Sequence, residues 1–190
     1  MSKPNQPIAL NLPPVDPLPE ATAKYFAICQ EKLGLVPNVL QAHAFDIDKL
    51  NAFTALYNDL MLGDSGLTKL EREMIAVTVS SENKCFYCLT AHGAAVRELS
   101  GDPKLGEALV MNYRVADLTP KQRAMLDFAV LMTKASATIE ETDRQALRDT
   151  GWTDRDIWDI ANIAAFYNMT NRVASALDMR PNDEYHARFR

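Results

Sequence analysis

The sequence predicts an all-α protein, and three observations support this fold class. Apolar residues recur mostly at intervals of three and four positions, which is the period of an amphipathic helix. Sustained alternation of apolar and polar residues, the pattern of strands, is missing. Glycine is scarce, at 7 of 190 residues, and most of the 10 prolines fall within the first 37 positions. The expected architecture is a helical bundle preceded by an extended arm.

The arm is expected over residues 1–19, because its prolines cannot donate the backbone hydrogen bonds of a helix interior. Periodic apolar segments then predict helices, in chain order, at 20–33, 38–44, 46–62, 68–82, 85–99, 103–110, 120–134, 140–150 and 154–177. The last segment is apolar on nearly every side at its centre. A helix with that pattern is buried all round, so we expect it to be the axis of the bundle.

Capping signals define several of these helix starts. A threonine followed three residues later by an acid or amide can satisfy two unpaired backbone amides of the first turn. The pattern occurs at Thr68 with Glu71, Thr119 with Gln122, Thr138 with Glu141, and Thr153 with Asp156. Pro120 falls at the first helical position, where its missing N–H costs nothing. These four starts are the best-defined boundaries.

Two of the capped segments resemble each other. LTKLEREMIAV at 67–77 and LTPKQRAMLDFAV at 118–130 share Leu-Thr, an arginine four residues after the threonine, and a methionine two residues further on. A degenerate internal duplication explains the match, and two similarly capped amphipathic helices explain it as well. If the chain is duplicated, only the first copy keeps the candidate site residues, because Ala124 occupies the place of Glu73 in the second copy.

Length and composition favour one soluble domain. A chain of 190 residues supports one well-buried core, so we expect a single domain over 1–190, with the helical core at 20–190. The formal charge of -5 gives no basic face for nucleic acid. Neither a signal peptide nor a membrane span is visible, which favours the cytoplasm. Thiols are kept reduced there, so a close cysteine pair is more often redox-active or metal-binding than structural.

The stretch SENKCFYCLTAH at 81–92 concentrates the reactive residues. It holds two of the three cysteines, Cys85 and Cys88, and one of the three histidines, His92. Their spacing of three and four places all three side chains on one face of a helix. Thiolates are stabilised at a helix N-terminus by unpaired amides and the macrodipole. His92 is close enough in sequence to support the Cys88 thiolate.

Glu73 is the fourth member of this group. It lies three residues after Leu70 and four before Val77, on the apolar face of the expected helix 68–82. A carboxylate in that position is costly to bury unless a hydrogen bond or a cation compensates. A turn at SENK would bring Glu73 towards the next helix. The sequence then predicts a dithiol, a base and a carboxylate that orients the base.

The run E-x11-C-x2-C-x3-H resembles the core motif of the alkylhydroperoxidase AhpD proteins of the carboxymuconolactone decarboxylase-like superfamily. Segments LGLVPNVLQAHA at 33–44 and AAFYNMTNRVASAL at 164–177 extend the resemblance to the uncharacterised peroxidase-related group. The resemblance implies an all-α, homo-oligomeric peroxidase whose substrates are a hydroperoxide and an external dithiol or disulfide-reductase donor. It implies no cofactor and no metal.

The resemblance also implies roles for the four residues. Cys88 would attack the peroxide, Cys85 would condense with the resulting sulfenic acid, and Glu73 with His92 would relay protons. Helix geometry alone also allows the reverse order of the two cysteines. One departure stands out: Tyr87 occupies the position before the second cysteine, where the best-known AhpD proteins have a histidine. Near neutral pH a tyrosine can donate a hydrogen bond but cannot act as that base.

Two alternatives remain for the cysteine pair. Two thiolates, an imidazole and a carboxylate could form a zinc site, in which case the chain is a helical binding or structural module. The pair could also be incidental, as buried apolar side chains. We expect Cys29, His43 and His186 to be structural or solvated, and Trp152 and Trp158 to serve packing. Four polar residues of the last long helix could line a pocket or a subunit contact, and internal hydrogen bonding explains them about as well: Tyr167, Asn168, Asn171 and Arg172.

Overall fold

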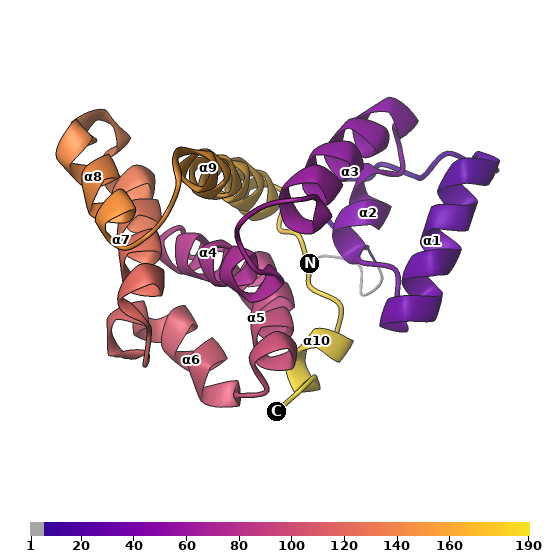
Figure 1. The fold of residues 1–190 in the computed structure, drawn as a ribbon. Coiled ribbons are helices and arrows are strands. Elements are labelled where there is room, and N and C mark those ends of the chain that lie inside the picture. Colours follow the sequence, from indigo (N-terminus) through magenta and orange to yellow (C-terminus); the bar gives the residue numbers. More distant parts are fainter. Residues whose placement is uncertain (1–5) are drawn as a thin grey trace.

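The computed structural model describes residues 6–190, and within this range the chain forms ten α-helices and no strand (Figure 1). Every expected helix is present, and the all-α prediction is confirmed. Two short 3-10 turns, Tyr113–Val115 and Ser136–Thr138, and the last helix were not expected. The helices are α1 Glu20–Leu33, α2 Asn38–His43, α3 Ile47–Leu62, α4 Lys69–Glu82, α5 Phe86–Ser100, α6 Pro103–Asn112, α7 Pro120–Ala135, α8 Glu141–Asp149, α9 Asp154–Ala176 and α10 Glu184–Ala187.

The buried axis of the bundle is α4. Ten consecutive residues of this helix, 72–81, are buried, and α3, α5, α6, α7 and α9 all pack around it. The prediction that α9 would be the axis was wrong. Trp158 and Met169 of α9 are 67% and 50% exposed, so this helix covers the axis with one side and leaves the other side open. Its apolar character on nearly every side therefore does not mean burial on every side.

Three of the four capping predictions are confirmed. Complete capping boxes join Thr68 to Glu71, Thr119 to Gln122, and Thr153 to Asp156. The prediction of Thr138 with Glu141 was wrong. The cap of α8 is Glu140, paired with Asp143, whereas the Thr138 hydroxyl donates to the carbonyl of Ala135. A 3-10 turn extends α7 as far as Thr138 and so shifts the start of α8.

The sequence match between 67–77 and 118–130 has a structural counterpart in two arginines. Arg72 on α4 donates to three carbonyls of the segment before its helix, those of Leu60, Gly63 and Leu67. Arg123 on α7 does the same with Tyr113, Arg114 and Ala116. Both side chains thus satisfy carbonyls that a loop would otherwise leave unpaired. The two segments share this local device as well as their capping boxes.

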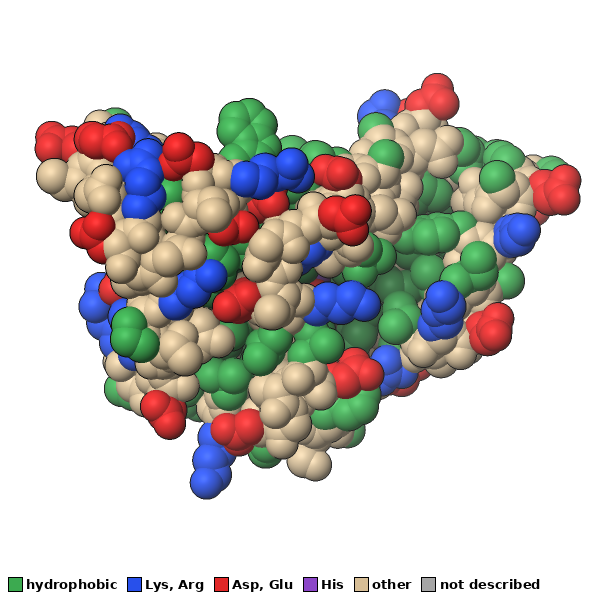
Figure 2. Space-filling view, viewed as in Figure 1, with side chains coloured by type: hydrophobic (Ala, Val, Ile, Leu, Met, Phe, Trp, Pro, Cys, Tyr) green, Lys and Arg blue, Asp and Glu red, His purple; other side chains and the backbone are tan. Residues whose placement is uncertain are grey.

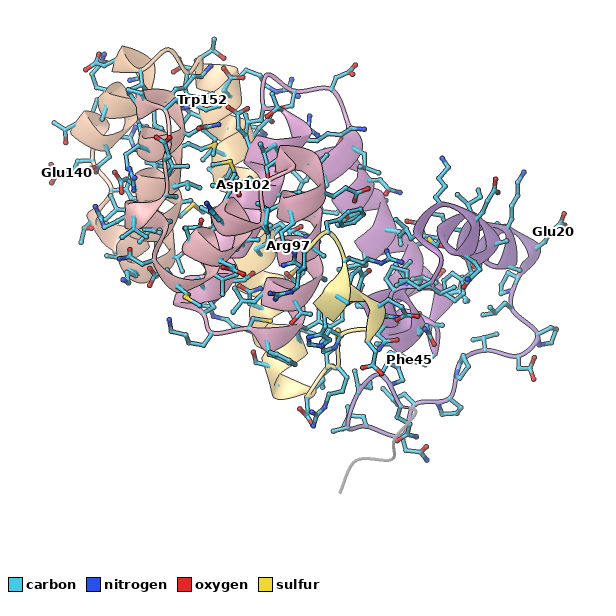
Figure 3. The ribbon with its side chains drawn as sticks, turned by 90° about the horizontal axis from the view of Figure 1, so that it is seen from below. Glu20, Phe45, Arg97, Asp102, Glu140 and Trp152 are labelled. Carbon is cyan, nitrogen blue, oxygen red and sulfur yellow. The ribbon has the colours of Figure 1, made fainter. Side chains whose placement is uncertain are left out.

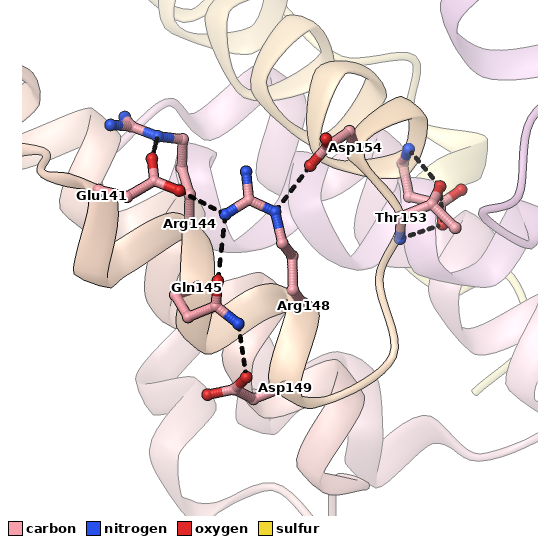
Figure 4. A network of polar contacts seen from close by, with 8 residues as sticks. Glu141, Arg144, Gln145, Arg148, Asp149, Thr153 and Asp154 are labelled. Atoms are coloured by element: carbon pink, nitrogen blue, oxygen red, sulfur yellow. Dashed lines mark hydrogen bonds and ion pairs between the residues drawn. The ribbon is translucent and has the colours of Figure 1, made fainter.

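The remaining helices lie on either side of the axis. In Figure 1, α1, α2 and α3 lie to one side, and α7 and α8 to the other. Arg148 of α8 pairs with Glu141 of its own helix at 2.6 Å and with Asp154 at the start of α9 at 2.7 Å (Figure 4). Such exposed ion pairs contribute little to stability, but they connect α8 to α9.

The C-terminal segment returns to the centre of the molecule after α9. Arg97 of α5 points towards α10 (Figure 3) and donates to the carbonyls of Tyr185 and Arg188. The N-terminal end of the described chain lies beside the segment that follows α9 (Figure 1). Ile8, near the start of the described residues, and α10 therefore both pack near α5.

The molecular surface mixes charges of both signs. On the face shown in Figure 2, acidic and basic side chains alternate, and apolar side chains gather in the hollow between α1 and its neighbours. A surface cavity of about 420 Å³ lies there, lined in part by Phe26, Leu35 and Val36. Within residues 6–190, none of the helices combines the length and the apolar character needed to traverse a bilayer.

Candidate active site

A tight turn between α4 and α5 places Cys85 at the start of α5. Lys84 adopts a left-handed conformation with φ 55°, which reverses the chain within a few residues. The amide of Cys85 donates to the carbonyl of Ser80 at 3.0 Å, and Cys85 is the N-cap residue of α5. Cys88 follows in the first helical turn. The two sulfur-bearing residues therefore lie at the end of a helix where amides are unpaired and anions are favoured.

Both cysteines are free thiols and are almost fully buried, with Cys85 1% and Cys88 4% exposed. The Cys88 thiol donates a hydrogen bond to Cys85, and this bond lowers the pKa of Cys85 to about 6 despite its burial. The Cys88 amide, Ser175 and the charge of His92 act in the same direction. The same hydrogen bond, together with burial, raises the pKa of Cys88 well above its usual range. The acidic thiol of the pair is therefore Cys85.

Polar side chains of α4 and α9 meet at Cys88. Ser80 and Asn171 act on the Cys88 thiol in the direction that lowers its pKa, and Asn171 Nδ2 donates to Ser80 Oγ at 2.9 Å. Asn83 closes the network, because its amide donates to the side-chain oxygens of Asn168 and Asn171, each at 3.0 Å. This network joins the α4–α5 turn to α9 and fixes the position of Cys88.

Glu73 and His92 form the second half of the site. His92 Nδ1 lies 2.7 Å from Glu73 Oε2, and both side chains are nearly buried. The ring of Tyr167 packs edge-on against His92, with centroids 4.8 Å apart. The Tyr167 hydroxyl lies 3.5 Å from the same Nδ1. These contacts hold the imidazole in one orientation.

The short contact to Glu73 determines which nitrogen of His92 can act. An ionised carboxylate only accepts hydrogen bonds, so Nδ1 of His92 is the donor. The other ring nitrogen, Nε2, is then the one that can take a proton. A carboxylate placed behind an imidazole also stabilises the protonated ring. The pair has the arrangement of a base with its orienting group.

Tyr87 does not take the place of the histidine found in the best-known AhpD proteins. Its hydroxyl accepts a hydrogen bond from the amide of Val39 in α2, at 3.1 Å. The side chain is 5% exposed, and burial raises its pKa. Tyr87 therefore anchors α2 to α5 and stays neutral.

The structure brings together the four residues that the sequence singled out, Cys85, Cys88, His92 and Glu73. Of the four polar residues of α9, Tyr167 and Asn171 contact them and Asn168 acts through Asn83, whereas Arg172 is exposed and binds Asn168. Ser80, Asn83 and Ser175 were missed. The polar run SSEN at 80–83 was a signal for Ser80 and Asn83, but Ser80 was assigned to the expected helix 68–82 and Asn83 to the turn at SENK; Ser175 had no such signal.

The other cysteine and histidines lie elsewhere. Cys29 of α1 packs with Leu40 and Leu50 in a separate apolar cluster. His43 donates to the Val39 carbonyl at 2.7 Å, and His186 lies in α10. Within the part of the chain that the structure describes, no group of three or more histidine, cysteine and acidic residues has the geometry to hold a metal ion. The zinc alternative gains no support.

The low pKa of Cys85 predicts a specific pH dependence. One thiol is expected to titrate with a midpoint near pH 6, well below the about 8.5 of an ordinary cysteine. Because the folded-state pKa is depressed, thiolate is present above this midpoint and is lost below it. Thiolate ultraviolet absorbance against pH measures the transition. Cys85→Ser should remove it, whereas Cys29→Ser should leave it, because burial raises the pKa of Cys29. A single transition near pH 8 to 9 would contradict the assignment.

Comparison with known proteins gives consistent results. Residues 48–110 match the carboxymuconolactone decarboxylase family. An uncharacterized peroxidase-related protein from Silicibacter sp. TM1040 is 72% identical over 100% of both chains, with a TM-score of 0.97. One from Ralstonia eutropha JMP134, described as an alkylhydroperoxidase AhpD core, is 45% identical over 95% of both chains, with a TM-score of 0.91.

A more distant structure shares the fold. The debrominase Bmp8 is 20% identical, with a TM-score of 0.75 over 88% of this chain and 89% of its own. No curated protein matches significantly. The two peroxidase-related structures cover nearly all of this chain at 72% and 45% identity. The chain therefore belongs to the AhpD-like peroxidase-related proteins of the carboxymuconolactone decarboxylase family.

Proposed function

We propose that this protein is a thiol-dependent peroxidase that reduces hydroperoxides through a dithiol–disulfide cycle of Cys85 and Cys88. One observation carries the proposal: an acidic buried thiol is hydrogen-bonded to a second thiol, and a nearby Glu73–His92 pair can manage protons. The peroxidase-related names of two relatives support the same class of reaction.

The first step oxidises Cys85. Its proton passes to His92, and the thiolate attacks the terminal oxygen of the hydroperoxide ROOH. An S–O bond forms as the O–O bond breaks, so the sulfur is oxidised to a sulfenic acid and the peroxide is reduced. The departing alkoxide takes the proton from His92 and leaves as the alcohol ROH. Glu73 stabilises the imidazolium between these two transfers.

The second step forms the disulfide. The Cys88 sulfur attacks the sulfenic sulfur of Cys85, and the S–O bond breaks as the S–S bond forms. The Cys88 proton leaves with the hydroxyl group as water. An external dithiol then restores both thiols by exchange and becomes a disulfide itself. All the electrons come from thiols, so the proposed cycle needs no cofactor or metal.

The proposed order of the two cysteines differs from the one that the family resemblance implies. That resemblance makes Cys88 the attacking residue. The hydrogen bond from Cys88 to Cys85, and the lowered pKa that it produces, favour Cys85 as the thiolate at neutral pH. The thiolate is the nucleophilic form of cysteine, and we therefore assign the first attack to Cys85.

Thiol titration tests the proposal directly. Adding one equivalent of a hydroperoxide to the reduced protein should lower the count of free thiols from three to one, because Cys85 and Cys88 join while Cys29 stays free. Mass spectrometry should locate the disulfide between Cys85 and Cys88, and a dithiol reductant should restore both thiols. Thiols that stay unchanged would favour a helical binding or structural module instead.

A further inference from the structure

The chain from Gln6 to Leu10, here called the N-terminal strap, lies against the sulfur pair. Ile8 belongs to the same apolar cluster as Cys85 and Cys88, and it is 4% exposed. Ala9 and Leu10, the two residues that follow it, point to solvent. Ile8 is therefore the one strap side chain that is inserted among the buried residues of the site.

Backbone hydrogen bonds hold the strap to the segment after α9. The amide of Ala9 donates to the carbonyl of Leu177 at 2.8 Å, and the amide of Arg180 donates to the carbonyl of Pro7 at 2.9 Å. Met179, which lies between the two bonded residues, is 5% exposed and packs in the same cluster. Strap and C-terminal segment thus form a cover over the sulfur atoms.

This cover conflicts with the chemistry of the site. A peroxide oxygen, or the sulfur of a reductant, must touch the sulfur that it reacts with. Neither cysteine is more than 4% exposed, and the larger of the surface cavities is lined by neither of them. Some part of the protein has to move before either reagent can reach the pair.

The strap is the element that can move most easily. Helices α4, α5 and α9 pack extensively on one another and open only with the fold. Among the residues that the structure describes, one buried side chain and two backbone hydrogen bonds hold the strap over the site. Segments with few buried contacts are the ones that open locally while the rest of a protein stays folded. The residues between 11 and 19 are mostly exposed, and a backbone hydrogen bond from the Val15 amide to the Ala44 carbonyl, at 2.9 Å, holds them to the end of α2 without restraining the strap itself.

We propose that the N-terminal strap gates the dithiol and that Ile8 is the residue that determines access to it. When the strap is closed, it keeps water and reagents away from the Cys85 thiolate. When the strap is open, the hydroperoxide can reach the thiolate. The reductant needs a wider opening, because its sulfur must approach the disulfide in line with the S–S bond. The role in peroxide chemistry rests on the proposed function, whereas the gating itself concerns only access to the two sulfur atoms.

Alkylation of the reduced full-length protein tests the gate. Iodoacetamide is added at fixed pH, and peptide mass spectrometry gives the rate at each cysteine separately. In Ile8→Ala the rate at Cys85 should rise about tenfold, because the truncated side chain loses most of the burial that closes the strap. Leu10→Ala is the matched control, since it shortens an exposed side chain of the same strap. It should leave the rate unchanged.

Two internal measurements separate gating from other effects. Cys29, in its own cluster, should react at the wild-type rate in both variants. The thiolate absorbance at the working pH should be the same in wild type and Ile8→Ala, so that faster labelling reports access and not a shifted pKa. An unchanged rate at Cys85 in Ile8→Ala, or a parallel rise at Cys29, would overturn the gate.

The labelling result is independent of peroxidase activity. If hydroperoxide leaves the thiols intact while Ile8→Ala still accelerates labelling, the proposed function fails and the gate remains. If peroxide turns over while Ile8→Ala labels like wild type, the gate fails and the proposed function remains.

Discussion

Replacing Cys85 with serine is expected to abolish the reaction with hydroperoxide, lowering its rate by at least about a thousandfold, the scale on which loss of a covalent nucleophile acts. The neutral serine hydroxyl cannot replace a thiolate near neutral pH. Cys88 cannot take over, since its hydrogen bond to residue 85, which the serine oxygen can still accept, and its burial raise its pKa and keep it protonated. Stopped-flow measurement of peroxide consumption by the reduced protein gives the rate.

The complementary variant separates the roles of the two cysteines. In Cys88→Ser, Cys85 should still react once, because a serine hydroxyl can donate the hydrogen bond that the Cys88 thiol now supplies. The product should be a sulfenic acid on Cys85, trapped with dimedone and located by mass spectrometry, with no disulfide and no further turnover. Cys29→Ser is the control and should behave like wild type.

One result would reverse the assignment. If Cys85→Ser accumulates a sulfenic acid on Cys88, the attacking residue is Cys88, as the family resemblance implies. The peroxidase proposal would survive that outcome, since both residues would still form the cycle. It would fail if neither single variant gave a sulfenic acid and the wild type gave no disulfide.

Replacing Glu73 with glutamine is expected to slow peroxide turnover by about a hundredfold, within the range that general acid–base groups contribute. The amide has nearly the same shape as the carboxylate but no charge, so it cannot stabilise the imidazolium of His92. It can also donate a hydrogen bond to Nδ1, which would leave the proton on Nε2 and remove the base. Steady-state turnover with a saturating dithiol measures the loss.

The matched control for this change is Glu82→Gln. Glu82 lies on the same helix, but it faces away from the site and pairs with Lys134 at 2.8 Å. The same chemical replacement there should leave turnover unchanged. Thermal unfolding followed by circular dichroism should show both variants folded. Full activity in a folded Glu73→Gln protein would show that the Glu73–His92 pair is structural.

The combination of burial and low pKa is central to both predictions. A buried thiolate is normally disfavoured, because it loses its hydration. Here hydrogen bonds from the Cys88 thiol and amide and from Ser175 replace that hydration. A nucleophile held in this way keeps its charge without bulk water. The strap proposed above would preserve this environment between turnovers.

Local sequence patterns determined most of the fold. All nine expected helices form within a few residues of their predicted ends, because apolar periodicity and capping boxes act over one or two helical turns. The placement of Cys88 and His92 on one helix, with Cys85 at its N-cap, also followed from spacing alone. The prediction that Thr138 caps α8 was wrong because Thr138 belongs to the 3-10 turn that extends α7. Local patterns do not encode where a preceding helix stops.

Longer-range properties depended on the tertiary structure. The sequence placed Glu73 on an apolar face, but only the packing of α4 against α5 brought it within 2.7 Å of His92. The sequence showed only that Tyr87 cannot act as a base and could donate a hydrogen bond, whereas the tertiary structure supplies Val39 of α2 as its partner, with the Tyr87 hydroxyl as acceptor. The role of α4 as the axis depended on which helices surround it, and the composition of α9 gave no sign that one of its sides stays open.

The sequence by itself determined the helices, the four candidate site residues and the family, because each of these depends on neighbours within a few positions or on a motif of fixed spacing. Only the tertiary structure decided which thiol is acidic, which groups of α9 surround it, and that Ile8 covers it from the opposite end of the chain. The contacts with α9 and with Ile8 join residues that lie far apart in the sequence, and all three features depend on burial that no local pattern specifies.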